Sequence, residues 1–406
     1  MNKYKDILID SFTYDLPSEK IARFPLEKRD ESKLLVYKNK TVSQDNFKNI
    51  DNYLQENSLL VFNNTKVIQA RLIFHKETGA RVEIFCLEPI DPSDFSLAFQ
   101  KTEKCKWKCI VGNLKKWKDK NLTRTFKYNN KDYILTATKI ESNNSSQYIE
   151  FSWNNSELNF SEVLEAIGEI PIPPYLNRES EESDKTRYQT IYSKHNGSVA
   201  APTAGLHFTD NVFDKLKNKN IDFAELTLHV GAGTFKPVKS QTIGEHEMHT
   251  EHIFINIDTL QRLINNIGKI TVVGTTSVRT LESLYWLGVK ILENKNIKSQ
   301  DLKISQWEIY ELNQNITTLD ALNAVHKYMT DKDRVTLSST TQIIIVPGYK
   351  FRVINYLITN FHQPKSTLLL LIAAFVGDDW KKIYDYALNN NFRFLSYGDS
   401  CLLIND

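Results

Sequence analysis

The hydrophobic positions follow a strand-like pattern in one part of the chain. Between residues 70 and 153, short runs rich in β-branched and aromatic residues alternate with clusters of Asn, Asp, Gly and Lys, and no helical period appears. The predicted strands span residues 71–75, 81–87, 106–111, 122–128, 133–139 and 147–153. Six short strands in succession predict a compact antiparallel β-barrel.

The rest of the chain alternates apolar strands with amphipathic helices. Strands are predicted at residues 33–37, 59–62, 221–229, 269–274, 342–346, 356–360 and 401–404. Helices are predicted at residues 160–167 and near 210–219, 258–267, 276–287, 366–376 and 380–390, whereas the polar segment 313–333 is expected to be peripheral. This alternation is typical of a sheet sandwiched between helices.

The predicted fold class is therefore α/β, with a helix-sandwiched catalytic sheet built from both ends of the chain and a small antiparallel β-barrel inserted into it. Residues 1–67 are the first part of the α/β domain, residues 68–155 the inserted barrel domain, and residues 156–406 the remainder of the α/β domain. A chain of 406 residues also exceeds what one hydrophobic core usually supports, which favours two domains.

Composition excludes several classes of protein. The chain is 41% hydrophobic and 25% charged, which is typical of a globular protein. No apolar run reaches membrane-spanning length and the N-terminus has no signal-peptide pattern, so we expect a cytoplasmic protein without a membrane partner. The four cysteines are too few for a disulfide framework, and Cys105 and Cys109 lack the second pair that a zinc site needs.

Charge is uneven along the predicted barrel. Residues 101–131 hold eleven basic residues against Glu103 and Asp119. The aromatic residues among them are Trp107, Trp117, Phe126 and Tyr128. Such a mixture can hold a phosphate backbone and stack bases, with Lys115, Lys116 and Lys118 as candidate contacts, or it can be a solvated lysine-rich face.

Five polar stretches begin at or near predicted strand ends, at residues 198–209, 229–235, 274–279, 359–367 and 396–399. Because open α/β sheets bind ligands beyond the carboxyl ends of their strands, we expect these stretches to share a pocket. Hydroxyls and amides at the helix start near residue 275 form a cradle for a carboxylate or phosphate, with Arg279 nearby. The candidate ligand-binding residues are Thr203, Gly205, Gly231, Gly233, Thr275, Thr276, Ser277, Arg279, Asn360, His362, Lys365 and Ser366.

Residues 245–252 contain three histidines and three glutamates, but they do not form the His-Glu-x-x-His motif, so no metal is expected. A histidine–carboxylate pair for proton transfer, His249 with Glu251 or Glu247, fits better. The chain also lacks a dinucleotide-binding glycine fingerprint, a Walker-type lysine loop and a Gly-x-Ser-x-Gly elbow.

These motifs resemble those of the S-adenosylmethionine:tRNA ribosyltransferase-isomerase family over nearly the whole chain. The resemblance rests on residues 12–17, 24–30, 62–72, 168–175, 187–192, 198–208, 228–235, 246–251, 274–279, 359–367 and 396–399. It implies transfer and isomerisation of the ribosyl moiety of S-adenosylmethionine onto the 7-aminomethyl-7-deazaguanine base at the tRNA wobble position. Epoxyqueuosine-tRNA, adenine and methionine would be the products.

The resemblance also implies that S-adenosylmethionine is a consumed substrate, with no true cofactor and no metal. A monomer that binds tRNA through the basic barrel is expected. The candidate catalytic residues are His249, Glu251, His207, His229 and Asp399. Whether His207 transfers a proton or only shapes the pocket stays open.

The chain departs from the family pattern at a few positions. Asn64 and Lys66 replace the usual Asp and Arg, Gln342 replaces an Asp, Gln363 replaces a Leu, and Ala80 replaces the second of two glycines. Two alternatives therefore stay open: another S-adenosylmethionine-dependent tRNA-modifying enzyme, such as a methyltransferase, and an inactive tRNA-binding relative.

Overall fold

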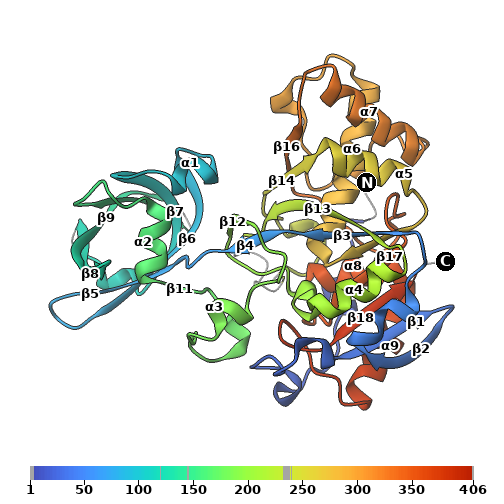
Figure 1. The fold of residues 1–406 in the computed structure, drawn as a ribbon, viewed down its shortest axis with the longest axis horizontal. Helices are drawn as coiled ribbons and strands as arrows, with labels where there is room; N and C mark the ends of the chain where they lie inside the picture. The colour runs from blue at the N-terminus through green and yellow to red at the C-terminus, as the bar shows by residue number, and fades with distance from the viewer. Residues whose placement is uncertain (1–3, 119, 144–145, 232–237, 239, 405–406) are drawn as a thin grey trace.

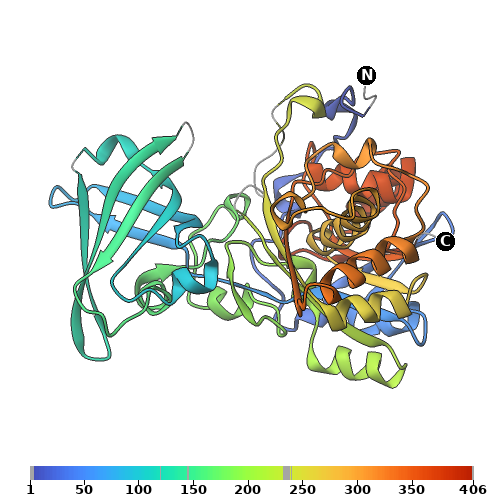
Figure 2. The same ribbon diagram turned by 90° about the horizontal axis from the view of Figure 1, so that it is seen from above.

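Two large β-sheets organise the molecule, and they lie side by side along its long axis (Figures 1 and 2). The computed structural model describes residues 4–118, 120–143, 146–231, 238 and 240–404. In this part of the chain the strands form a nine-stranded sheet, a seven-stranded sheet and a two-stranded pair.

The nine-stranded sheet has the strand order β16-β14-β13-β3-β15-β17-β18-β1-β2. Its strands are β1 (Lys33–Lys38), β2 (Thr41–Asn46), β3 (Leu59–Asn63), β13 (Asp222–His229), β14 (Glu251–Asn256), β15 (Ile270–Val273), β16 (Thr336–Thr341), β17 (Tyr356–Asn360) and β18 (Ser400–Ile404). The neighbouring strands β13, β3, β15 and β17 are parallel. Their carboxyl ends therefore lie at one edge of the sheet, where open α/β sheets bind ligands.

Helices cover both faces of this sheet. Because side chains alternate along a strand, Leu59 and Val61 pack in one hydrophobic cluster with α5 to α9, whereas Leu60 and Phe62 pack in another with α4. The helices are α4 (Asp210–Asn218), α5 (Ile257–Asn265), α6 (Thr275–Glu293), α7 (Thr318–Thr330), α8 (Thr367–Val376) and α9 (Trp380–Asn389). The predicted α/β class is confirmed. None of the helices described is long and apolar enough to span a bilayer.

The seven-stranded sheet is antiparallel, with the order β11-β5-β6-β7-β10-β9-β8. Its strands are β5 (Arg71–His75), β6 (Arg81–Asp91), β7 (Lys104–Gly112), β8 (Asn121–Tyr128), β9 (Lys131–Asn143), β10 (Ser146–Trp153) and β11 (Gly168–Glu169). The sheet curls (Figure 1), and Arg124 on β8 donates to the carbonyl of Ile73 on β5 at 2.8 Å. All six strands predicted between residues 70 and 153 are confirmed.

Two short helices, α1 (Phe95–Phe99) and α2 (Phe160–Ile167), pack on the seven-stranded sheet. A capping box starts α2: Asn159 accepts from the N–H of Glu162 at 3.0 Å, and Glu162 accepts from the N–H of Asn159 at 2.8 Å. Because α2 buries Phe160 and Leu164 in the core of this sheet, that core extends past residue 155. The pair β4 (Thr65–Val67) and β12 (His195–Ser198), together with α3 (Asp184–Arg187), lies between the two large sheets (Figure 1).

Two predictions were wrong. The segment 313–333 is not merely peripheral, because α7 lies along the buried helix α6 and inserts Leu322 and Val325 into the main core. At the contact, a Cβ on Gly288 would lie 2.1 Å from the carbonyl oxygen of Ala321, so only glycine allows this approach. The apolar run 342–346 is not a strand. The hydroxyl-rich segment just before it forms β16. Within the run, Ile343 and Ile345 pack in the main core, and Ile344 and Val346 pack in a separate small cluster.

Candidate functional site

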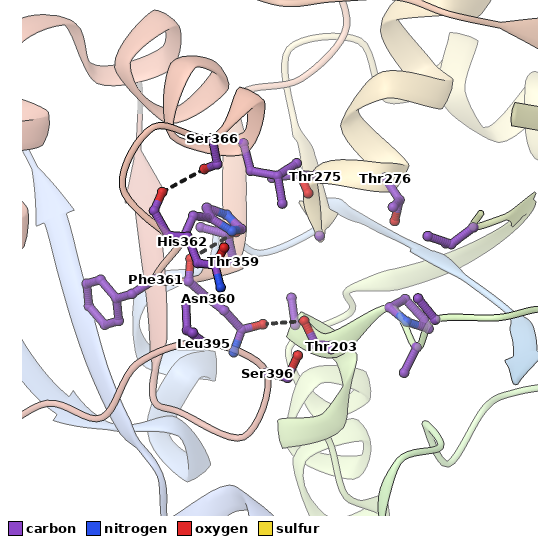
Figure 3. A pocket seen from close by; sticks show the side chains of 18 of the residues that line it. Thr203, Thr275, Thr276, Thr359, Asn360, Phe361, His362, Ser366, Leu395 and Ser396 are labelled. Atoms are coloured by element: carbon purple, nitrogen blue, oxygen red, sulfur yellow. Dashed lines mark hydrogen bonds between the residues drawn. The ribbon is translucent and has the colours of Figure 1, made fainter. Parts of the chain in front are cut away.

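A cavity lies at the edge of the nine-stranded sheet where three parallel strands end (Figure 3). Val230 follows β13, residues 274–276 follow β15, and residues 359–363 lie at the end of β17. Residues 200–204 and Ser396 complete the wall. We call this space the strand-end cavity. It brings together all five of the polar stretches that were predicted to share a pocket.

No charged side chain of the described residues lines the strand-end cavity. The polar side chains of its wall are those of Tyr175, Thr203, Thr275, Thr276, Thr359, Asn360, His362, Gln363, Ser366 and Ser396. Its volume of about 80 Å³ is below the roughly 300–1,000 Å³ of pockets that enclose a whole drug-sized ligand. Hydroxyl and amide groups in a small neutral space suit the sugar part of a larger ligand.

Helix α6 begins in the wall of this cavity. Its N-cap is Gly274, whose φ of +86° is in the region that favours glycine, and no side chain caps the helix. The first amides of a helix have no intrahelical partner and carry the positive end of its dipole. Thr276 is 9% exposed, and its Oγ1 is buried without a partner among the described residues. This end of α6 is therefore suited to a carboxylate or another oxyanion.

Arg279 and Glu251 bind each other behind the cavity. The Nη1 group of Arg279 donates to the carboxylate of Glu251, and its Nε donates to the carbonyl of Ile343 at 3.2 Å. Burial raises the pKa of Glu251, and Arg279 opposes that shift. Neither residue lines the cavity, and the role of Arg279 in the anion cradle stays a prediction. The side chain of His249 is exposed and does not line the cavity.

His207 lies at the centre of a buried hydrogen-bonded chain. It belongs to the 3-10 turn Thr203–His207 and is 4% exposed. Its Nδ1 lies 2.8 Å from Ser32 Oγ and its Nε2 lies 3.3 Å from Asn360 Nδ2. Asn360 Oδ1 accepts from Thr203 Oγ1 at 3.0 Å, which links His207 to the cavity wall (Figure 3). Burial, with a contribution from two nearby arginines, lowers the pKa of His207 to about 3, so the ring is neutral at physiological pH.

The loop after β17 holds two of the predicted residues in the cavity and one away from it. His362 lines the cavity with its Nε2 3.0 Å from Thr359 Oγ1, and burial lowers its pKa to about 3. Ser366 also lines the cavity and caps α8 by accepting from the N–H of Leu369 at 3.2 Å. Lys365 is exposed and does not line the cavity; its Nζ lies 2.6 Å from Asp10.

A second, larger cavity lies between the two large sheets. We call it the groove; α1 contributes Phe95 to it and β13 contributes His229, and its volume is about 710 Å³. The Nδ1 atom of His229 lies 3.2 Å from Thr65 Oγ1, and its ring centroid lies 4.7 Å from that of Phe95. Burial, then the neighbouring histidines, lowers the pKa of His229 to about 4. The next residue, Val230, lines the strand-end cavity, so each of the two spaces has a lining residue at the end of β13.

The remaining predicted residues lie elsewhere. Asp399 is 2% exposed and accepts from the backbone N–H groups of Lys33 and Arg393, which ties the last loop to β1. Gly205 is buried; a Cβ there would lie 1.9 Å from the hydroxyl oxygen of Tyr192. Ser277 is buried in the first turn of α6, Gly231 follows the cavity residue Val230, and Gly233 lies outside the described residues.

The aromatic residues of the lysine-rich segment belong to a core. Trp107, Trp117 and Phe126 are 0%, 2% and 7% exposed, and Tyr128 is partly buried against the same core. Of the two alternatives, base stacking by the first three is therefore not favoured. Trp107 and Phe126 face inward from β7 and β8, and Trp117 packs into the same core from the turn between these strands. The predicted contacts Lys115, Lys116 and Lys118 are exposed.

Sequence reasoning missed part of both spaces. Thr359, Gln363 and Ser396 line the strand-end cavity; each stood within a predicted polar stretch, and that position was the available signal. In the groove, Asn64 lies beside Glu225, whose carboxylate also binds Lys194. No local pattern marked these three residues as neighbours.

Metal-binding side chains are not grouped in the described part of the chain: it contains no set of three or more His, Cys, Asp or Glu residues that could hold a metal ion. The four cysteines are buried free thiols.

Comparison with known proteins identifies the family. The family model described as queuosine biosynthesis protein matches residues 9–403. A protein of Trichlorobacter lovleyi named S-adenosylmethionine:tRNA ribosyltransferase-isomerase is 35% identical over 404 residues, covering 98% of this chain and 100% of that protein. A protein of Halothermothrix orenii with the same name is 36% identical over 403 residues, covering 98% and 99%. A crystal structure of S-adenosylmethionine tRNA ribosyltransferase from Thermotoga maritima is 26% identical, covers 97% of this chain and 99% of its own, and gives a TM-score of 0.44. The chain belongs to the queuosine biosynthesis protein family.

Proposed function

We propose that this chain is an S-adenosylmethionine:tRNA ribosyltransferase-isomerase. The observation that carries the proposal is the family match over residues 9–403, joined to full-length relatives of that name. The reaction moves the ribosyl moiety of S-adenosylmethionine onto the 7-aminomethyl-7-deazaguanine base of the tRNA wobble position and isomerises it. The products are epoxyqueuosine-tRNA, adenine and methionine.

We assign the ribosyl moiety to the strand-end cavity, because its small walls and uncharged hydroxyls suit a sugar. The methionine carboxylate then lies at the start of α6, where backbone amides and Thr276 supply donors. S-adenosylmethionine is a consumed substrate in this proposal, with no true cofactor and no metal. Full turnover after dialysis against a chelator would support the absence of a metal requirement, and loss of turnover that metal restores would contradict it.

We assign the acid–base role to His229. Thr65 Oγ1 lies within 3.4 Å of the carbonyl of His195, so its proton is used there and it accepts from Nδ1–H of His229. The unprotonated Nε2 then carries the lone pair that a general base needs. The other catalytic candidates fit less well: Asp399 and Glu251 are held in buried contacts, and His249 lines neither cavity.

The domain architecture predicted from the sequence gives each part of the molecule a role in the proposed reaction. Residues 1–67 and 156–406 are proposed to form the catalytic α/β domain, except that α2 and β11 complete the core and sheet of the inserted barrel. Residues 68–155 are the inserted barrel domain, which helps to hold the tRNA. The groove between the two sheets takes the modified base, since its volume of about 710 Å³ is in the range of ligand pockets. We propose a cytoplasmic monomer, which a molecular mass measured in solution would test.

Product analysis tests the function. The protein is incubated with S-adenosylmethionine and tRNA that carries the 7-aminomethyl-7-deazaguanine base, and we expect adenine and methionine to be released in equal amounts. Release of S-adenosylhomocysteine instead would identify a methyltransferase. Binding of both substrates without any product would identify an inactive tRNA-binding relative.

A further inference from the structure

We propose that the buried chain Ser32–His207–Asn360 fixes the hydrogen-bonding direction of Thr203, so that this hydroxyl accepts a hydrogen bond from the ligand in the strand-end cavity. Thr203 then selects a ligand group that donates, namely a ribosyl hydroxyl. His207 is a positioning residue in this arrangement and takes no part in proton transfer. The identity of the ligand rests on the proposed function, but the direction of the hydrogen bonds from Ser32 to Thr203 does not.

The protonation of the His207 ring sets the direction of the hydrogen bonds. Its Nδ1 faces Ser32 Oγ at 2.8 Å, and its Nε2 faces the amide nitrogen of Asn360 at 3.3 Å. An amide nitrogen can only donate, so Nε2 accepts and carries the lone pair. Because the ring is neutral, its proton lies on Nδ1, which donates it to Ser32 Oγ.

Asn360 transmits this direction. Its Nδ2 donates to His207 Nε2 at 3.3 Å, so its Oδ1 is turned towards Thr203. Thr203 Oγ1 donates its only proton to that oxygen at 3.0 Å. The hydroxyl has no second proton, so towards the cavity Thr203 offers lone pairs alone.

The part of the wall at the start of α6 can donate hydrogen bonds, whereas Thr203 accepts them. Backbone amides begin α6 there, and the hydroxyl of Thr276 has no partner in the described structure, so this wall can donate. A matching ligand presents an oxyanion to α6 and a hydroxyl to Thr203. Both groups occur in S-adenosylmethionine.

A first experiment determines the direction of these hydrogen bonds without measuring activity. Long-range nitrogen–proton NMR separates protonated from unprotonated imidazole nitrogens, and histidine-to-glutamine variants assign the signals. We expect His207 to be neutral, with its proton on Nδ1, from pH 5 to pH 9. The charged groups nearest the ring are Arg29 and Arg393, which both oppose a further positive charge. A proton on Nε2, or titration of His207 within this range, would overturn the proposal.

The isosteric change Asn360→Asp provides a matched test. A carboxylate cannot donate to Nε2, so it favours a second proton on the ring, and His207 should begin to titrate within the same pH range. Unchanged His207 signals in a folded Asn360→Asp protein would contradict the direction assigned here. If this variant does not fold, the wild-type spectrum and the Thr203 variants still decide.

A second experiment measures selectivity by calorimetry, with S-adenosylmethionine and its 2′-deoxy and 3′-deoxy analogues in the absence of tRNA. We expect wild type to bind one analogue about tenfold more weakly, Thr203→Val to lose that discrimination, and Thr203→Ser to retain it. Thr276→Val should retain it as well. Wild-type protein that binds all three ligands equally, or Thr203→Val that still discriminates, would overturn this inference alone. Wild-type protein that does not bind S-adenosylmethionine would overturn the proposed function and the ligand named here. The His207 tautomer would still test the direction of the hydrogen bonds separately.

Discussion

Thr276 has a hydroxyl that is buried at the start of α6 without a partner in the described structure. A buried unpaired hydroxyl lowers stability, and a ligand carboxylate that accepts from it restores the hydrogen bond. For Thr276→Val we therefore expect about tenfold weaker binding of S-adenosylmethionine and an unchanged or higher melting temperature. Calorimetry and thermal unfolding measure the two effects.

Thr280→Val is the matched control, because Thr280 lies one turn further along α6 and donates to the carbonyl of Thr276 at 3.1 Å. It should bind S-adenosylmethionine as wild type does. Equal loss of affinity in both variants would show that the helix, rather than the hydroxyl, was disturbed.

The Arg279–Glu251 pair makes a prediction about stability. Glu251→Leu leaves a guanidinium buried and unpaired, so we expect a loss of about 3–5 kcal/mol in the free energy of unfolding. The exposed pair Arg262–Asp222 is the control, and Asp222→Ala should cost less than about 1 kcal/mol. Urea denaturation measures both variants, and equal losses would contradict a special role for the buried pair.

At the scale of an element, β12 positions the proposed base. Gly197 has a φ of +149°, and a Cβ there would lie 2.5 Å from His229 Cε1. Gly197→Ala should therefore displace the imidazole and lower the rate of adenine release at least tenfold. Gly79→Ala adds a Cβ at another positive φ, +78°, with no atom within 4 Å, and should keep the rate. Equal rates in the two variants would argue against His229 as the base.

The elements also show how far sequence reasoning reaches. The six antiparallel strands were predictable because a period of two residues is a local signal, and the cavity was predictable because parallel strands bring their ends together. The helix α7 was missed because its few apolar positions stand among polar residues, and their meaning depends on the partner α6. The Arg279–Glu251 pair depends on how β14 is placed against α6, which no spacing along the chain reveals. Burial of Trp117 depends on how the turn between β7 and β8 folds back onto the core of the curled sheet, which no local pattern reveals.

At the scale of the molecule, three neutral histidines make stability depend on pH. The pKa values of His207, His229 and His362 are lowered from 6.5 to about 3, 4 and 3. Between those values and 6.5 only the unfolded chain takes up the proton, so acidification favours unfolding. We expect each histidine to remove about 2 kcal/mol between neutral pH and pH 5. Urea denaturation from pH 7 to pH 5 measures the slope, which should be shallower in His207→Gln; an unchanged slope would contradict a neutral His207.

The proposed tRNA site extends over the whole molecule, because the groove lies between the two sheets and the lysine-rich segment belongs to the curled one. Neutralising Lys115, Lys116 and Lys118 to glutamine should weaken tRNA binding and reduce the slope of log affinity against log salt. Each lost contact with a single-stranded phosphate changes that slope by about 0.7, so the three together remove up to about 2. In the control, the exposed residues Lys295, Lys298 and Lys303 are changed to glutamine. They lie in the segment that follows α6, a helix packed on the nine-stranded sheet. A slope that is unchanged by the first set, or reduced equally by the second, would place the phosphate contacts elsewhere on the protein.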